Sequence, residues 1–114
     1  MINLKTVFEK VNLVVPVEQR RFFNYFNDTV TELEASYGEL VFDKDKGFEP
    51  VYDIDDFCPI RPLYLAAIVD NILYFTSGQD TYKTEFIRKA LEAYLRYWNN
   101  KSKGKRWGGR EVTW

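Results

Sequence analysis

Apolar residues recur at helical spacing in two stretches of the first third of the chain. Near the N-terminus they are spaced three and four apart, and Asn3 precedes them as a candidate N-cap, which predicts a short amphipathic helix over 3–11. The apolar positions are Leu4, Val7, Phe8 and Val11. A second stripe predicts a longer helix over 17–37, after Pro16 and before Gly38. Its members are Phe22, Phe26, Val30, Leu33 and Tyr37.

Residues 38–61 show no helical period and contain two glycines and two prolines, so we expect a long irregular connection. Two short apolar runs, at 40–42 and 49–52, flank a polar stretch with a turn signal at Lys46-Gly47. A small β-hairpin is therefore one alternative for this excursion.

A third helix is predicted over 62–77, and it is apolar around almost its whole circumference. We expect it to be the central element of the core. Only Asp70 and Asn71 interrupt it, and buried polar groups need partners. We interpret the pair as a packing feature that bonds a neighbouring helix or faces another protomer, rather than as a ligand site.

A fourth helix is predicted over 81–99, capped by Asp80. One apolar stripe carries Tyr82, Phe86, Ala90 and Tyr94, and a neighbouring stripe carries Ile87, Leu91 and Trp98. The fold class that follows is mostly α: a small bundle of about four helices over 1–99, with the excursion between the second and third helices and an extended C-terminal arm over 100–114.

The net charge of the chain changes sign at the same boundary, between residues 99 and 100. Residues 1–99 hold 11 Lys and Arg against 16 Asp and Glu, whereas residues 100–114 hold five basic residues and one acid. An acidic body thus carries a basic arm. No apolar run reaches the roughly 18 residues that span a bilayer, and the N-terminus lacks the pattern of a signal peptide. We expect neither membrane insertion nor signal-peptide secretion.

The composition removes most familiar catalytic sites. There is no histidine and one cysteine, Cys58, so His-based acid–base catalysis, His-activated nucleophiles and Cys/His zinc sites are excluded. A lone cysteine fits a reducing compartment. Aromatic residues make up 18% of the chain, and large rings dominate core and interface energetics.

Two acidic stretches are candidates for chemistry. The stretch from Asp43 to Gly47 resembles the start of a calcium loop, but Phe48 and Ile54 occupy the positions where an EF-hand needs glycine and glutamate. Asp53, Asp55 and Asp56 lack a histidine or metal partner, and acids beside Cys58 would raise the pKa of its thiol. We therefore expect no catalytic residue, no cofactor and no metal site.

The arm is the strongest candidate for an interaction site, because it mixes cations with tryptophans. The residues concerned are Lys101, Lys103, Lys105, Arg106, Trp107, Arg110 and Trp114. This mixture serves both nucleic-acid binding and docking on acidic proteins. A solvated, disordered end is the third alternative. We favour a protein partner, because the acidic body would repel a phosphate backbone.

The layout resembles the small helical head-tail connector proteins of tailed bacteriophages, also called adaptor or head-completion proteins. The resemblance rests on the short first helix, on the long helix that ends Glu32-Leu-Glu-Ala-Ser-Tyr-Gly38, and on the apolar helix from Pro62 to Phe75 that follows an irregular excursion. The fourth helix and the basic tryptophan arm depart from the family pattern.

The resemblance implies a non-enzymatic structural protein of the virion neck, made in the host bacterial cytoplasm. Such proteins form homo-oligomeric rings under the portal protein and join it to tail-side neck proteins, and their terminal segments grip neighbouring subunits or the portal. We expect no direct nucleic-acid binding on this interpretation. The alternatives are a small nucleic-acid-binding or regulatory module that uses the arm, and, as a weaker third class, an enzyme subunit.

Overall fold

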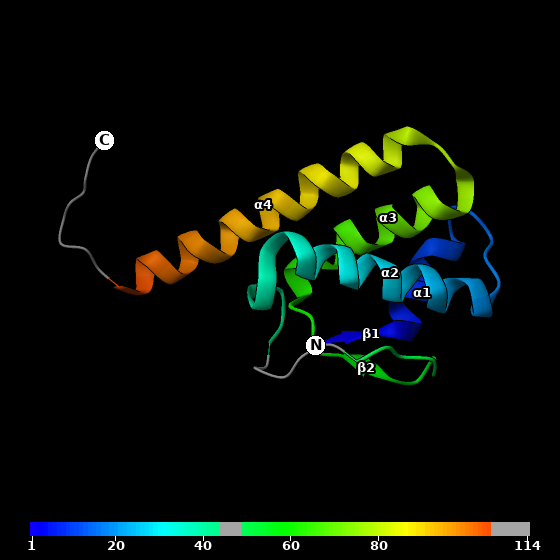
Figure 1. Cartoon of the computed structure of the whole chain (residues 1–114), viewed down its shortest axis with the longest axis horizontal. Helices are drawn as coiled ribbons and strands as arrows, with labels where there is room; N and C mark the ends of the chain where they lie inside the picture. Colours follow the sequence, from blue (N-terminus) through cyan, green and yellow to red (C-terminus); the bar gives the residue numbers. More distant parts are fainter. Residues whose placement is uncertain (44–48, 106–114) are drawn as a thin grey trace.

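The computed structural model describes residues 1–43 and 49–105, with side chains for all of these except Glu39 and residues 100–105. Helices dominate it, as predicted (Figure 1). In chain order the elements are β1 (Ile2–Asn3), α1 (Leu4–Asn12), α2 (Gln19–Tyr37), the 3₁₀ helix η1 (Gly38–Val41), β2 (Phe57–Cys58), the 3₁₀ helix η2 (Pro62–Tyr64), α3 (Leu65–Ser77) and α4 (Asp80–Lys105).

The helix boundaries follow local chemistry. The Asn3 side chain accepts a hydrogen bond from the Lys5 backbone N–H at 2.8 Å, which confirms Asn3 as the N-cap of α1. Gly38 ends α2 with φ of +68°, and Gly78 ends α3 with φ of +77°. Both angles lie in the left-handed region, which glycine enters without steric cost, so both helices stop where the sequence predicts.

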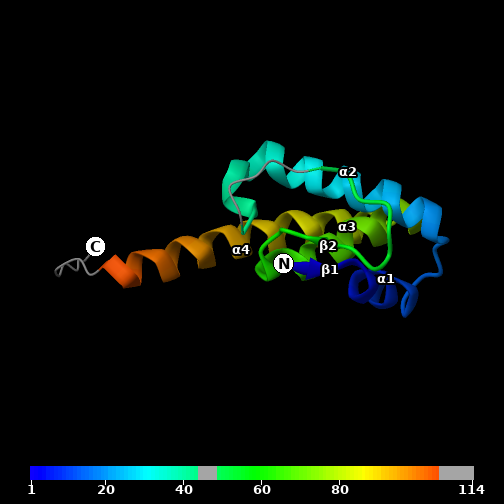
Figure 2. The same cartoon turned by 90° about the horizontal axis from the view of Figure 1, so that it is seen from below.

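The helix α3 lies at the centre of the bundle, as predicted. It packs antiparallel along α4 and also contacts α1 and α2 (Figures 1 and 2). Its Ile68 and Ile72 are fully buried. The α2 stripe faces the same core: Phe22, Phe26, Val30 and Leu33 are fully buried, and Tyr37 is partly exposed at its end.

The hairpin alternative for the 38–61 excursion is wrong for the runs at 40–42 and 49–52, which do not pair with each other. Phe42 forms an antiparallel bridge with Ile60, and β2 pairs antiparallel with β1 at the N-terminus. The physical reason is burial, because Val41, Phe42, Cys58 and Ile60 all enter the core, whereas 49 and 50 are exposed. The predicted turn at Lys46-Gly47 lies outside the described residues.

The helix α4 continues six residues beyond the predicted end at Asn99 and reaches Lys105. The first part of the arm, which we expected to be extended, is therefore helical. Lysines in the last turn are favourable there, because they face the partial negative charge at the C-terminal end of a helix. Figures 1 and 2 show this end of α4 reaching past the rest of the bundle.

Candidate protein-interaction surface

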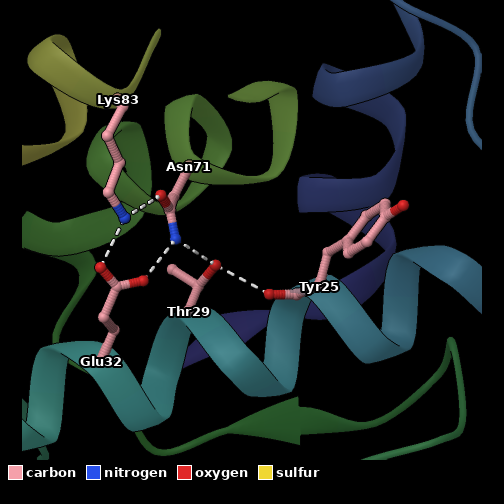
Figure 3. A network of polar contacts seen from close by, with 5 residues as sticks. All are labelled: Tyr25, Thr29, Glu32, Asn71 and Lys83. Atoms are coloured by element: carbon pink, nitrogen blue, oxygen red, sulfur yellow. Dashed lines mark hydrogen bonds and ion pairs between the residues drawn. The ribbon is translucent and has the colours of Figure 1, made fainter. Parts of the chain in front are cut away.

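A polar network lies between α2, α3 and α4 (Figure 3). The Asn71 side-chain amide on α3 donates to Thr29 Oγ1 at 2.9 Å and to Glu32 Oε1 at 3.1 Å, both on α2. From α4, Lys83 Nζ donates to Asn71 Oδ1 at 3.1 Å and forms an ion pair with Glu32. The Thr29 hydroxyl donates to the Tyr25 carbonyl at 2.7 Å. Every polar atom of the Asn71 amide group thus has a partner.

The network holds the bundle together and leaves no free group for a ligand. The Lys83 ammonium also lies over aromatic rings, 4.9 Å from the Phe86 centroid and 5.5 Å from that of Tyr74, a cation–π arrangement. The second polar residue of α3, Asp70, is buried. Its Oδ2 lies 2.6 Å from Lys89 Nζ on α4, so the two side chains form an ion pair, although their angles do not meet the geometry of a hydrogen bond. These contacts confirm the packing interpretation of Asp70 and Asn71.

The outer face of α4 is an apolar surface that no other element of the described ranges covers. Ile87, Leu91 and Leu95 are 57, 47 and 50% exposed, and their spacing of four places them in one row. We call this row the α4 stripe. Among residues 80–99 of this helix, only Phe86, Ala90 and Ala93 are buried, so the predicted stripe of Ile87, Leu91 and Trp98 lies on the exposed side. Leu95 was missed because the pattern assigned it to neither stripe.

Rings and charges border the α4 stripe. Beside the stripe, the Tyr94 ring stacks on Tyr37 of α2 with centroids 4.8 Å apart and meets Trp98 edge-on at 6.3 Å, so these rings pack α4 against α2. Arg88, next to Ile87 in the sequence, forms ion pairs with Glu85 and Glu92 of the same helix, with a nitrogen–oxygen distance of 2.6 Å in each. The hydrogen bond from Arg88 lowers the pKa of Glu85, and the same contact raises the pKa of Arg88. Both charges are therefore satisfied within the helix.

A second exposed surface lies on the loop that leads into β2. Tyr52 and Phe57 are 65 and 55% exposed, and the carboxylates of Asp53, Asp55 and Asp56 stand between them in the sequence. We call these five residues the loop patch. Within the described part of the chain, its carboxylates form no ion pair.

Of the acidic stretch from Asp43 to Gly47, only Asp43 lies within the described residues. Asp43 is engaged by the N-terminal ammonium and lies 3.8 Å from Arg61. No cluster of metal-binding side chains occurs among residues 1–43 and 49–105. Cys58 is fully buried, and this burial raises the pKa of its thiol to about 12. The raised pKa was predicted, but its main cause is desolvation rather than the neighbouring acids.

The surface also carries a shallow cleft of about 480 Å³ where α1 meets α2. Residues of the connecting segment, such as Pro16 and Val17, line it together with Arg21, Tyr25 and Thr76. The described lining holds one acid, Glu18, so it lacks the paired carboxylates that acid–base chemistry would need.

The predicted interaction residues fall at the end of α4 and beyond it. Lys101, Lys103 and Lys105 belong to its last turns, while Arg106, Trp107, Arg110 and Trp114 lie outside the described residues. Comparison with protein-family models, curated proteins and solved structures finds no match to this chain. None of the helices in the described ranges is long and apolar enough to cross a membrane.

Proposed function

We propose that this chain is a non-enzymatic structural protein that assembles with further copies of itself. The α4 stripe is the observation that carries the proposal. Burial of apolar surface contributes about 25 cal/mol per Å², and three half-exposed aliphatic side chains in one row are a surface that gains free energy when covered. A second copy is the occupant that needs no additional component.

The class of protein we propose is the head-tail connector of tailed bacteriophages, a ring in the virion neck between the portal protein and tail-side neck proteins. The order of a short helix, a long helix, an irregular excursion and an apolar central helix supports it. So does a body tied together by the Asn71 network, because a structural ring requires rigid subunits with exposed contact surfaces.

Mass measurement by light scattering tests the proposed assembly. We expect the purified chain to exceed its monomer mass of 13.6 kDa and to show rings by electron microscopy. Leu91→Lys should shift the mass toward the monomer, since it places a charge in the stripe. Thr81→Lys, an exposed position of α4 outside the stripe, adds the same charge and should leave the mass unchanged.

Two results would contradict the proposed self-assembly: a wild-type chain that stays monomeric over a wide concentration range, and binding to DNA with steep salt dependence. The alternative then favoured is a nucleic-acid-binding module, whose affinity comes from release of counterions by the five cations of the arm.

A further inference from the structure

The loop patch exposes its two rings on a backbone that is held firmly. The Asn27 side chain bonds both the N–H and the carbonyl of Val51 at 3.0 Å, just before Tyr52. Asp53 Oδ1 accepts from the Asp55 N–H at 3.0 Å, and the Asp56 carbonyl accepts from the Leu4 N–H at 3.2 Å. A surface fixed in this way binds a partner at lower entropic cost than a mobile loop does.

The patch is apolar at its ends and strongly acidic between them. The Tyr52 ring rests edge-on against Phe23, with centroids 6.3 Å apart, and leaves most of its surface open. From Glu49 to Ile60 the chain carries four carboxylates and no basic residue. Exposed rings with an acidic border suit a partner that offers both aromatic side chains and cations.

The chain itself contains a segment with that complementary chemistry. We propose that the loop patch receives residues 101–114 of a second copy of this chain, a pairing that rests on the proposed self-assembly and names its contact surface. The segment combines five cations with one acid, and its Trp107 and Trp114 can meet Tyr52 and Phe57. Tryptophan is enriched among the residues that dominate binding energy, while charges at a rim steer orientation and association rate.

The arrangement of the molecule favours a second copy over the same chain. The loop before β2 and the C-terminal end of α4 lie toward opposite ends of the long axis in both views (Figures 1 and 2). Residues that follow Lys105 therefore begin far from the patch of their own chain. One copy's arm on the next copy's patch is a head-to-tail contact, which closes into a ring when the rotation between neighbours allows it.

Two charge-reversal variants of the full chain test this pairing. The patch variant is Asp55→Lys with Asp56→Lys, chosen because neither side chain bonds a described residue. The arm variant is Lys103→Glu with Arg106→Glu. We expect each variant alone to show reduced assembly at moderate salt. An equimolar mixture should recover assembly, because the unaltered arm meets the unaltered patch and the reversed arm meets the reversed patch with opposite charge.

A synthetic peptide of residues 101–114 provides a direct measurement. It should bind the arm variant, whose patch is intact, and bind the patch variant roughly tenfold more weakly, because like charges then oppose each other. Glu9→Lys with Glu34→Lys is the matched control: it changes the net charge by the same amount at two acids that are not part of the patch, and it should leave peptide affinity unchanged. Circular dichroism establishes that every variant is folded. If the patch variant does not fold, Asp55→Asn with Asp56→Asn takes its place, because it removes both negative charges without reversing them.

Equal peptide affinity for the patch variant and its matched control would overturn the pairing, as would peptide binding to DNA without binding to the protein. The pairing can fail while the proposed function stands. If the wild-type chain assembles and depends on Leu91 but not on Asp55 and Asp56, copies associate through the α4 stripe and the patch has no part in it. A wild-type chain that stays monomeric overturns the proposed function itself.

Discussion

At the scale of single residues, Tyr64 shows how the core accepts a polar atom at a cost. It is the largest fully buried side chain among the described residues, and its hydroxyl has no hydrogen-bond partner there. Burial raises the pKa of this hydroxyl to about 12, with a further contribution from Tyr37. The ring fills the space between η2 and the end of α2, whereas the hydroxyl adds only a desolvation penalty.

Tyr64→Phe should therefore keep or raise the stability of the protein, by about 0 to 1 kcal/mol, because it keeps the ring and removes a buried hydroxyl that no described residue pairs with. Urea unfolding of the two proteins measures the difference. A loss of more than about 1 kcal/mol would mean that the hydroxyl has a partner in solution. Tyr37→Phe is a matched control, since Tyr37 is partly exposed.

Cys58 and Tyr64 together predict loss of stability at alkaline pH. Their pKa values are raised from ordinary values of 9.0 and 10.0 to about 12 in the folded chain. Below about pH 8 both groups stay protonated in the folded and unfolded states, so they do not alter the free energy of unfolding. As pH rises toward 12, the unfolded chain releases these protons first, and the folded state loses stability.

The measurement is urea unfolding at about pH 8 and about pH 11, compared between the wild type and Cys58→Ala with Tyr64→Phe. The double variant should lose less stability over this interval. An equal loss in both proteins would assign the alkaline sensitivity to other groups.

At the scale of elements, the helices could be predicted because their signals are local. The Asn3 cap, the positive-φ glycines at 38 and 78 and the stripe from Phe22 to Leu33 each act within a few residues of the chain. The pairing of β1 with β2 could not be predicted. It joins Ile2 to Cys58, and a two-residue strand has too few positions to show an alternating pattern.

The outer face of α4 shows a second feature that the sequence pattern could not predict, namely which of two apolar stripes is buried. A helix with apolar residues on two adjacent stripes gives no local sign of which stripe is covered, because coverage depends on neighbours far away in sequence. Here α3 and η2 pack along α4, whose Phe86, Ala90 and Ala93 are buried while Ile87 and Leu91 stay exposed. The candidate surface is therefore visible only once the packing is known.

The same isoleucine-to-alanine change should separate the two environments. Ile68→Ala on α3 removes fully buried atoms and should cost about 2 to 5 kcal/mol, because the central helix cannot close the cavity. Ile87→Ala on α4 should change monomer stability by less than about 1 kcal/mol, because the side chain is already exposed and alanine favours a helix. Urea unfolding at low protein concentration tests both, and a small cost at Ile68 would show that α3 is peripheral.

At the scale of the whole molecule, the shape of the subunit and the distribution of its charge both favour head-to-tail association. The folded body carries the acidic excess and the loop patch, whereas Lys101, Lys103 and Lys105 belong to the end of α4 that reaches past it (Figure 1). An elongated subunit with opposite charges toward its two ends favours head-to-tail over face-to-face association, because the latter brings like charges together. The α4 stripe supplies apolar area that charge pairing at a solvated rim lacks.

Truncation after Lys105 tests this division of roles, because it removes Arg106, Trp107, Arg110 and Trp114 and leaves the described part of α4 complete. We expect an unchanged thermal unfolding midpoint and a lower assembled mass, and Trp107→Ala should reproduce much of that loss at unchanged charge.

Truncation after Asn99 should weaken assembly further, since Lys101, Lys103 and Lys105 are then lost as well. Normal assembly of both truncated chains would mean that the arm serves another partner, and steeply salt-dependent binding of the full chain to DNA would identify that partner as nucleic acid.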